Sequence, residues 1–438
     1  MDYAEFTDWM FSLERFGIKL GLENITEFLS RIGDPHKGLR SVHVAGTNGK
    51  GSVCAFLQRI MMAHGMTAGL YTSPHLVDFR ERVKIGDEEI PEKDVLRIGL
   101  KLKAIADEMA AEDREQQLTF FEFTTALAFE HFRERKPDIV VAEVGMGGRL
   151  DATNVLTPEV SVITRIGLEH TNYLGTAIQD IAREKAGIIK PGIPVVTCER
   201  NPDSLSVIAG VCRKKESRLI RIDEDFYVSK VEESLTGTEF EYSGWKTSRM
   251  RTKLLGSYQA YNAATALASA ELLHDRGIHI PIAEMKKGIL ETEWPGRLDV
   301  ASRDPLLILD GSHNPDGITT TVRVLSDLGI QPLTFVLGCM DDKDAVGIVR
   351  AIAPIAARII VTQARYKRAL PAAKLGEIVR REYHGPAEVI ESSEKAFETG
   401  LASKAGKGTC IIGSLYLVGE AIPWWGVRKG VHGASHKL

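Results

Sequence analysis

Apolar and polar positions alternate along the first half of the chain in blocks that predict a parallel α/β architecture. Short apolar runs predict buried strands, and segments with apolar residues at helical spacing separate them. The predicted strands are 42–45, 67–71, 139–144 and 160–166, and the predicted helices are 3–16, 50–63 and 119–132. Strands that alternate with helices in this way form a parallel sheet with helices on both faces. We therefore expect an N-terminal domain built on a mostly parallel sheet.

The pattern changes in the second half of the chain. Residues 222–255 alternate apolar and polar positions around two glycines, which predicts antiparallel strands appended to the first domain. An Ala-rich helix is expected over 256–274, and the segment Trp294-Pro295-Gly296-Arg297 then interrupts the chain. A second, smaller Rossmann-like α/β series follows, with strands predicted at 306–309, 333–337, 358–362, 387–390 and 409–412. We place the domain boundary there, giving domains 1–294 and 295–438.

Composition excludes several classes of protein. The 438 residues are 44% hydrophobic and 26% charged, as in a globular protein of two or more domains. A net charge of −4 gives no basic face for nucleic acid. No apolar run approaches the ~20 residues that span a membrane. The N-terminus has no signal-peptide pattern, and the five scattered cysteines suggest neither a zinc site nor disulfides. We expect a cytoplasmic monomer with a frayed Gly-, His- and Lys-rich tail after Trp425.

The segment Gly46-Thr47-Asn48-Gly49-Lys50-Gly51-Ser52 joins a predicted strand to a predicted helix. Its glycines permit a tight loop whose N–H groups, together with the helix N-terminus, form an anion site. Lys50 adds a positive charge, and the Ser52 hydroxyl can ligate a phosphate-bound Mg²⁺. The segment departs from the usual phosphate-loop pattern because Gly51 separates Lys50 from the hydroxyl residue. We interpret it as a nucleoside triphosphate site; the alternative is an ordinary glycine-rich turn.

Three further residues are candidate metal ligands. Glu143 ends an otherwise apolar strand, where open α/β sheets bind ligands, and a pairing with Arg149 is the alternative. Ser73 follows a strand and precedes Pro74, so it is either a metal ligand or a turn residue. His170 lies in a loop after another strand, where a lone histidine is more often structural.

Lys185 lies on the apolar stripe of a predicted helix, together with Ile178, Ile181 and Ala182. A buried lysine is costly as a cation unless it is paired. Either its stem carries the ammonium to an acidic rim, or the neutral amine has reacted with CO₂ to form a carbamate.

Several strings identify a resemblance. Besides the glycine-rich loop they are Tyr71-Thr72-Ser73-Pro74-His75-Leu76, Glu143 to Asn154, Glu184-Lys185-Ala186-Gly187-Ile188-Ile189-Lys190 and Asp310-Gly311-Ser312-His313-Asn314-Pro315. In this order and over nearly the whole chain, they resemble the folylpolyglutamate synthase and dihydrofolate synthase family of the Mur-ligase superfamily. The chain departs from the family pattern at Met146, Ser312, Glu169 and Asn172, the last two standing where Asp is common.

The resemblance implies an ATP- and Mg²⁺-dependent ligase that joins L-glutamate to a folate or dihydropteroate through an acyl phosphate, with two ions expected. It implies metal ligands Ser52, Ser73, Glu143, His170 and carbamylated Lys185. It implies ATP contacts from Thr47 to Ser52 and from Asn262, Arg297, Asp310 and His313. Lys50, Lys185 and His313 are the expected catalytic residues. It leaves Lys343 and residues 413–416 open between a structural role and the glutamate site.

Two alternatives remain at this level. A Mur ligase acting on a UDP-linked muropeptide would share the glycine-rich loop, although the string Tyr71–Leu76 argues against it. A phosphate-loop switch would bind nucleotide without joining anything. Phosphate release that depends on both folate and glutamate separates these functions.

Overall fold

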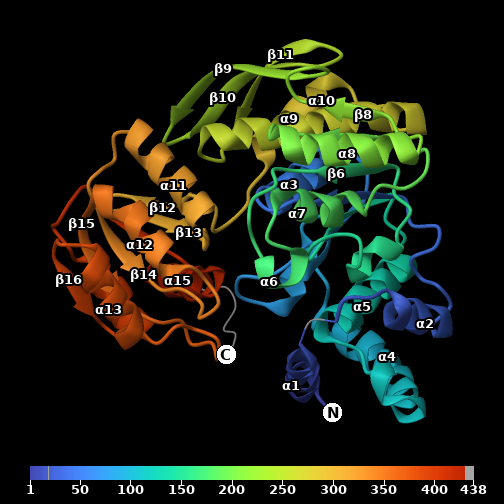
Figure 1. Cartoon of the computed structure of the whole chain (residues 1–438), viewed down its shortest axis with the longest axis horizontal. Coiled ribbons are helices and arrows are strands. Elements are labelled where there is room, and N and C mark those ends of the chain that lie inside the picture. Colours follow the sequence, from blue (N-terminus) through green and yellow to red (C-terminus); the bar gives the residue numbers. More distant parts are fainter. Residues whose placement is uncertain (18, 430–438) are drawn as a thin grey trace.

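A computed structural model describes residues 1–17 and 19–429, and it contains two α/β bodies joined by a single segment around residue 295 (Figure 1). The strands are β1 Ser41–Ala45, β2 Ala68–Tyr71, β3 Val83–Ile85, β4 Glu88–Glu89, β5 Ile139–Glu143, β6 Val160–Ile163, β7 Val195–Thr197, β8 Leu219–Arg221, β9 Tyr227–Ser234, β10 Gly237–Ser243, β11 Thr247–Thr252, β12 Asp299–Arg303, β13 Leu306–Asp310, β14 Leu333–Leu337, β15 Ala356–Val361, β16 Ala387–Val389 and β17 Thr409–Ile412. The α-helices are α1 Tyr3–Ser12, α2 Glu23–Arg31, α3 Lys50–Ala63, α4 Glu92–Glu112, α5 Phe120–Arg135, α6 Thr171–Leu174, α7 Ile178–Ala186, α8 Pro202–Lys214, α9 Ser257–Leu272, α10 Ile282–Glu291, α11 Pro315–Asp327, α12 Ala345–Ile352, α13 Ala372–Glu382, α14 Ser393–Leu401 and α15 Leu415–Arg428.

An eight-stranded sheet forms the core of the first body, in the order β4-β3-β2-β5-β1-β6-β7-β8. All neighbours from β2 to β8 are parallel, whereas β3 and β4 form an antiparallel edge. Strand β1 is buried along its whole length because helices cover both of its faces. Val44 of β1 lies beside Glu143 of β5, and Ala45 of β1 lies beside Ile163 of β6. The strands β5, β1 and β6 therefore end at the same edge of the sheet. Ligands bind at this edge in open parallel sheets.

A small antiparallel sheet, in the order β11-β10-β9, lies at one end of the first body (Figure 1). Phe240, Tyr242 and Met250 alternate with half-buried or exposed polar residues, and they are buried in the same apolar cluster as Ala263 and Leu267 of α9. The appended antiparallel strands expected from the sequence are confirmed.

The second body contains a six-stranded sheet in the order β12-β13-β17-β14-β15-β16. Its strands are parallel except for β12, which pairs antiparallel with β13 at the edge. We expected the first strand of this body at Leu306, and that expectation missed the edge strand β12. Residues 299–303 are half-buried and carry few large apolar side chains, so the edge strand has little hydrophobic signal.

The fold class expected from the sequence is confirmed, with differences at element ends. Helix α3 has the predicted bounds, and a capping box between Thr119 and Glu122 opens α5 as expected. The strand expected over 160–166 stops at Ile163. Helix α15 continues past Trp425 to Arg428 and is capped by Lys429, so the tail is helical where fraying was expected; residues 430–438 lie outside the described residues. No helix within residues 1–17 and 19–429 has both the length and the apolar composition needed to cross a membrane.

Candidate active site

The glycine-rich loop links β1 to α3, and two of its glycines are required by close packing. Gly49 has φ +94° at the N-cap of α3, and a Cβ there would lie 2.5 Å from the Asn262 side-chain oxygen. A Cβ on Gly51 would lie 2.8 Å from the Trp294 ring, which explains the glycine between Lys50 and Ser52. The first-turn N–H groups of α3 and the Lys50 ammonium therefore face a site suited to phosphate.

Hydrogen bonds from the loop that follows β6 fix the shape of the glycine-rich loop. The Thr47 N–H donates to the Arg165 carbonyl at 2.8 Å, and the Thr164 hydroxyl donates to the Asn48 carbonyl at 2.8 Å. The Thr47 hydroxyl contacts both the N–H and the carbonyl of Gly167, at 3.0 and 3.1 Å. The loop that carries His170 is thus bound to the glycine-rich loop through Thr47.

A cleft of about 740 Å³ lies between the two bodies, and both bodies line it. The predicted residues that it brings together are Thr47, Asn48, Gly49, Lys50, Gly51, Ser52, Ser73, Glu143, His170, Asn262, Arg297 and His313. Arg165, Arg200 and Arg323, which the sequence reasoning missed, add positive charge to its lining. Carboxylates of Glu143, Glu169, Glu199, Asp316 and Asp327 line the same cleft, so it offers cations to a polyphosphate and oxygen ligands to a metal ion.

Glu143 is buried beside the glycine-rich loop. Burial raises the pKa of its carboxyl group, and the nearby Lys50 ammonium opposes that shift. Oε2 accepts a hydrogen bond from the Ser73 N–H at 3.1 Å, and Oε1 has no donor among the described residues. The pairing with Arg149 that was the alternative is wrong, because Arg149 binds Glu184 at 2.9 Å.

Lys185 and His170 line a second cavity of about 20 Å³ beside Lys50 and Glu169. Lys185 is 4% exposed, and its amino group donates to the Gly46 carbonyl at 2.8 Å. Its stem therefore does not reach an acidic rim. Burial, with the Lys50 charge, lowers the pKa of Lys185 to about 7. Burial also lowers the pKa of His170 to about 4, so its ring is neutral at pH 7, as a metal ligand must be.

Asp310 does not line the cleft, although the resemblance suggested an ATP contact there. It is 1% exposed, and its carboxylate accepts hydrogen bonds from the Leu298 N–H, the Ser312 N–H and the Thr321 hydroxyl at 2.8, 3.0 and 3.1 Å. In this arrangement Asp310 shapes the loop that presents Arg297 and His313.

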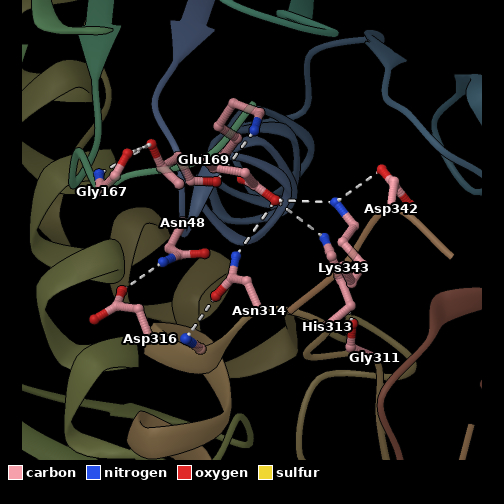
Figure 2. Close-up of polar contacts among 12 residues, drawn as sticks. Asn48, Gly167, Glu169, Gly311, His313, Asn314, Asp316, Asp342 and Lys343 are labelled. Atoms are coloured by element: carbon pink, nitrogen blue, oxygen red, sulfur yellow. Dashed lines mark hydrogen bonds and ion pairs between the residues drawn. The ribbon is translucent and has the colours of Figure 1, made fainter. Parts of the chain in front are cut away.

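Polar contacts cross the cleft between the two bodies, and Figure 2 shows how they converge. One Glu169 oxygen lies 3.4 Å from His313 Nε2 and 3.5 Å from Lys343 Nζ. The Asn48 amide donates to Asp316 at 2.8 Å. Burial alone would raise the pKa of Glu169, but His313, His170 and Lys343 hold that pKa below its ordinary value. The sequence marked Glu169 only as a departure from the family pattern.

The described residues contain no group of three or more His, Cys, Asp or Glu side chains placed to share a metal ion. The predicted metal set includes serines and a lysine that would require modification, so this finding does not test it. Glu143 still offers a carboxylate oxygen without a protein donor, which suits a hard cation.

Comparisons with known proteins support the same relationship. Residues 44–270 match the Mur ligase middle domain, and residues 296–414 match the Mur ligase glutamate ligase domain. The folylpolyglutamate synthase of Lacticaseibacillus casei is 35% identical over 422 residues, which cover 95% of this chain and 97% of that protein. The dihydrofolate synthase/folylpolyglutamate synthase of Bacillus subtilis is 33% identical, with 95% and 98% covered. This chain belongs to the folylpolyglutamate synthase/dihydrofolate synthase family.

Two solved structures of this family share the fold. Mycobacterium tuberculosis folylpolyglutamate synthase, complexed with ADP and AMPPCP, has a TM-score of 0.89 at 29% identity, covering 97% of this chain and 98% of that one. Escherichia coli FolC in complex with DHPP and ADP has a TM-score of 0.86 at 29% identity, covering 98% and 100%. The resemblance expected from the sequence motifs is confirmed.

Proposed function

We propose that this protein is an ATP-dependent ligase that adds L-glutamate to folates, with dihydropteroate as a further acceptor. The observation that carries the proposal is the cleft in which the glycine-rich loop faces Arg297 and His313 of the glutamate ligase domain. Relatives solved with ADP and with DHPP support the same substrate classes.

The proposed reaction has two steps. The terminal carboxylate of the acceptor attacks the γ-phosphorus of ATP, giving an acyl phosphate and ADP. The neutral amine of glutamate then attacks the acyl carbon, so that an amide bond forms, phosphate leaves and the amine loses a proton. No protein nucleophile takes part, and catalysis rests on positioning and charge stabilisation. Lys50, Arg297, His313 and the N–H groups of α3 supply the positive charge around the phosphates.

The proposal includes two Mg²⁺ ions. Ser52, Ser73 and Glu143 would hold one of them, and His170 with modified Lys185 would hold the other. Oxygen-rich donors of this kind suit Mg²⁺, and the ions supply charge neutralisation of the phosphoryl group. The unpartnered oxygen of Glu143 supports the first site.

Carbamylation of Lys185 is part of the proposal. An amine with a pKa of about 7 is largely neutral at mildly alkaline pH, and neutral amines react with CO₂. The amine nitrogen bonds the carbon of CO₂ and releases one proton, which leaves an N-linked carboxylate. The product replaces a neutral amine by an anion beside Lys50 and provides oxygen ligands next to His170.

The test uses purified protein with ATP, Mg²⁺, labelled glutamate and one acceptor at a time, either dihydropteroate or a tetrahydrofolate. We expect a glutamylated product for at least one acceptor, with one ADP formed per bond. ATP turnover without any such product would contradict the proposal. The same experiment shows the acceptor range and, by mass, the length of the glutamate chain.

No specific observation favours the alternatives. Whole-chain similarity to folate ligases gives no support to a muropeptide acceptor, and a nucleotide switch has no need of the glutamate ligase domain. We also propose that the enzyme is cytoplasmic and monomeric, because its substrates are small soluble molecules and residues of one chain line the cleft.

A further inference from the structure

Glu169 connects the two bodies at the centre of the cleft. Its Oε1 atom faces three groups of the C-terminal body, His313 Nε2 at 3.4 Å, Lys343 Nζ at 3.5 Å and Asn314 Nδ2 at 3.4 Å (Figure 2). The side chains of Glu169 and Lys343 are each only 14% exposed, so solvent screens their attraction less than at an open surface.

The same glutamate is bound to the glycine-rich loop through its own backbone segment. Two residues before it, Gly167 exchanges hydrogen bonds with the Thr47 side chain at 3.0 and 3.1 Å. A short path of polar contacts therefore runs from the phosphate-binding loop of one body to His313 and Lys343 of the other. The Asn48–Asp316 hydrogen bond at 2.8 Å spans the cleft beside this path.

The hydrogen bonds of His313 fix which atoms it presents. Its Nδ1 lies 2.9 Å from the Gly311 carbonyl, which only accepts, so Nδ1 carries a hydrogen. Nε2 is thereby directed at Glu169 Oε1, 3.4 Å away on the other body.

We propose that Glu169 is a positioning residue that fixes His313 and Lys343 of the glutamate ligase domain in register with the phosphate-binding loop. Glu169 needs no contact with substrate for this role. It holds these two side chains where the transferred phosphoryl group would pass between the bodies, which rests on the function proposed above. An aspartate would be shorter by one C–C bond, about 1.5 Å, so its oxygen would not span the same gap.

The test compares Glu169→Gln, which keeps the size and loses the charge, with Glu169→Asp, which keeps the charge and loses the reach. We expect each to lower kcat by about 10- to 100-fold, because misplacement by an ångström has effects of this size. The Kd for ADP should change little, since the phosphate-binding loop is intact. Asp342→Asn is the matched control: Asp342 lies 3.8 Å from the same Lys343 but on the same body, and this variant should keep wild-type kcat.

A double-mutant cycle with Lys343→Met separates positioning from a general loss of structure. If Glu169 acts through Lys343 and His313, Glu169→Gln should lower kcat clearly less in the Lys343→Met background than in the wild type, because only the contact with His313 then remains to be lost. The proposal would be overturned if the kcat losses of Glu169→Gln and Lys343→Met simply multiplied in the double variant. Wild-type kcat in both Glu169 variants would also overturn it. Urea unfolding midpoints equal to that of the wild type verify that the variants are folded. A wild-type protein that forms no glutamylated product would instead overturn the ligase function.

Discussion

At the scale of single residues, two lysines close to each other have opposite requirements. Lys50 must be a cation to hold phosphate, whereas Lys185 is buried nearby with a pKa lowered to about 7. The Lys50 charge is itself one cause of that shift. Their proximity therefore favours chemistry that removes the charge of Lys185.

Replacing Lys50 tests the phosphate site. Lys50→Ala should lower kcat by about 10²- to 10³-fold, because it removes a charge aimed at the transferred phosphoryl group. The urea midpoint should be unchanged, since Lys50 makes one hydrogen bond, to the Thr47 carbonyl at 3.3 Å. A folded variant with near-normal turnover would mean that ATP binds elsewhere.

Replacing Lys185 should raise stability while abolishing activity. Without bicarbonate, the folded state must hold an amine with a pKa near 7, whereas the unfolded chain binds a proton up to about pH 10.5. This mismatch destabilises the wild type most below pH 7, and its effect shrinks as pH rises toward 10.5. Lys185→Met should therefore stabilise the protein by up to about 4 kcal/mol at pH 6 and by clearly less at pH 9. Urea titrations at the two pH values measure the free energy of unfolding. Equal stabilisation by Lys185→Met at pH 6 and pH 9 would contradict a lowered pKa of the buried amine.

At the scale of elements, packing at the first turn of α3 fixes the position of the phosphate-binding site. Gly51 is in the first turn of α3, and its missing Cβ makes room for Trp294, which directly precedes the segment joining the two bodies. Packing of the phosphate-binding helix is thereby linked to the direction in which the chain enters the second body.

Gly51→Ala should destabilise the protein by about 1–3 kcal/mol, because its methyl group must displace the Trp294 ring. Gly210→Ala in α8 is a matched control, since the nearest atom to its Cβ is 3.9 Å away on a flexible arginine. In a helix interior this change should stabilise the fold by about 0.5–1 kcal/mol. Guanidinium unfolding measures the free energy of unfolding of both variants. Equal changes would show that the Trp294 ring moves aside without cost.

Local signals explain which elements the sequence predicts. The bounds of α3 follow from a glycine-rich loop and helical spacing, both within a few residues. Strand β12 has neither a long apolar run nor strict alternation, so only its pairing with β13 defines it. The Glu169–Asn314 contact joins residues 145 positions apart, and no local pattern contains that information. Asp310 carries a family motif, yet backbone N–H groups occupy its carboxylate.

At the scale of the whole molecule, the cleft depends on how two bodies joined by one segment near residue 295 lie against each other. Arg297 stands on the joining segment, lines the cleft and lies near the glycine-rich loop. Movement of one body about this segment would open and close the phosphate site.

Arg297→Lys tests this arrangement. A lysine keeps the charge but lacks the planar fork that binds two phosphate oxygens together. We expect kcat to fall by about tenfold or more, and Arg297→Ala to lower it further, with unfolding midpoints close to that of the wild type. Steady-state kinetics with ATP as the varied substrate measures both; full activity in the alanine variant would remove Arg297 from the site.

The most direct measurement follows oxygen from the acceptor to phosphate. The enzyme is supplied with ATP, Mg²⁺, glutamate and a folate whose terminal carboxylate carries ¹⁸O. If ligation passes through an acyl phosphate, each amide bond formed should transfer one ¹⁸O atom to inorganic phosphate, and phosphate release should require the acceptor. Phosphate without the label, or released at the same rate when the folate is omitted, would contradict the account.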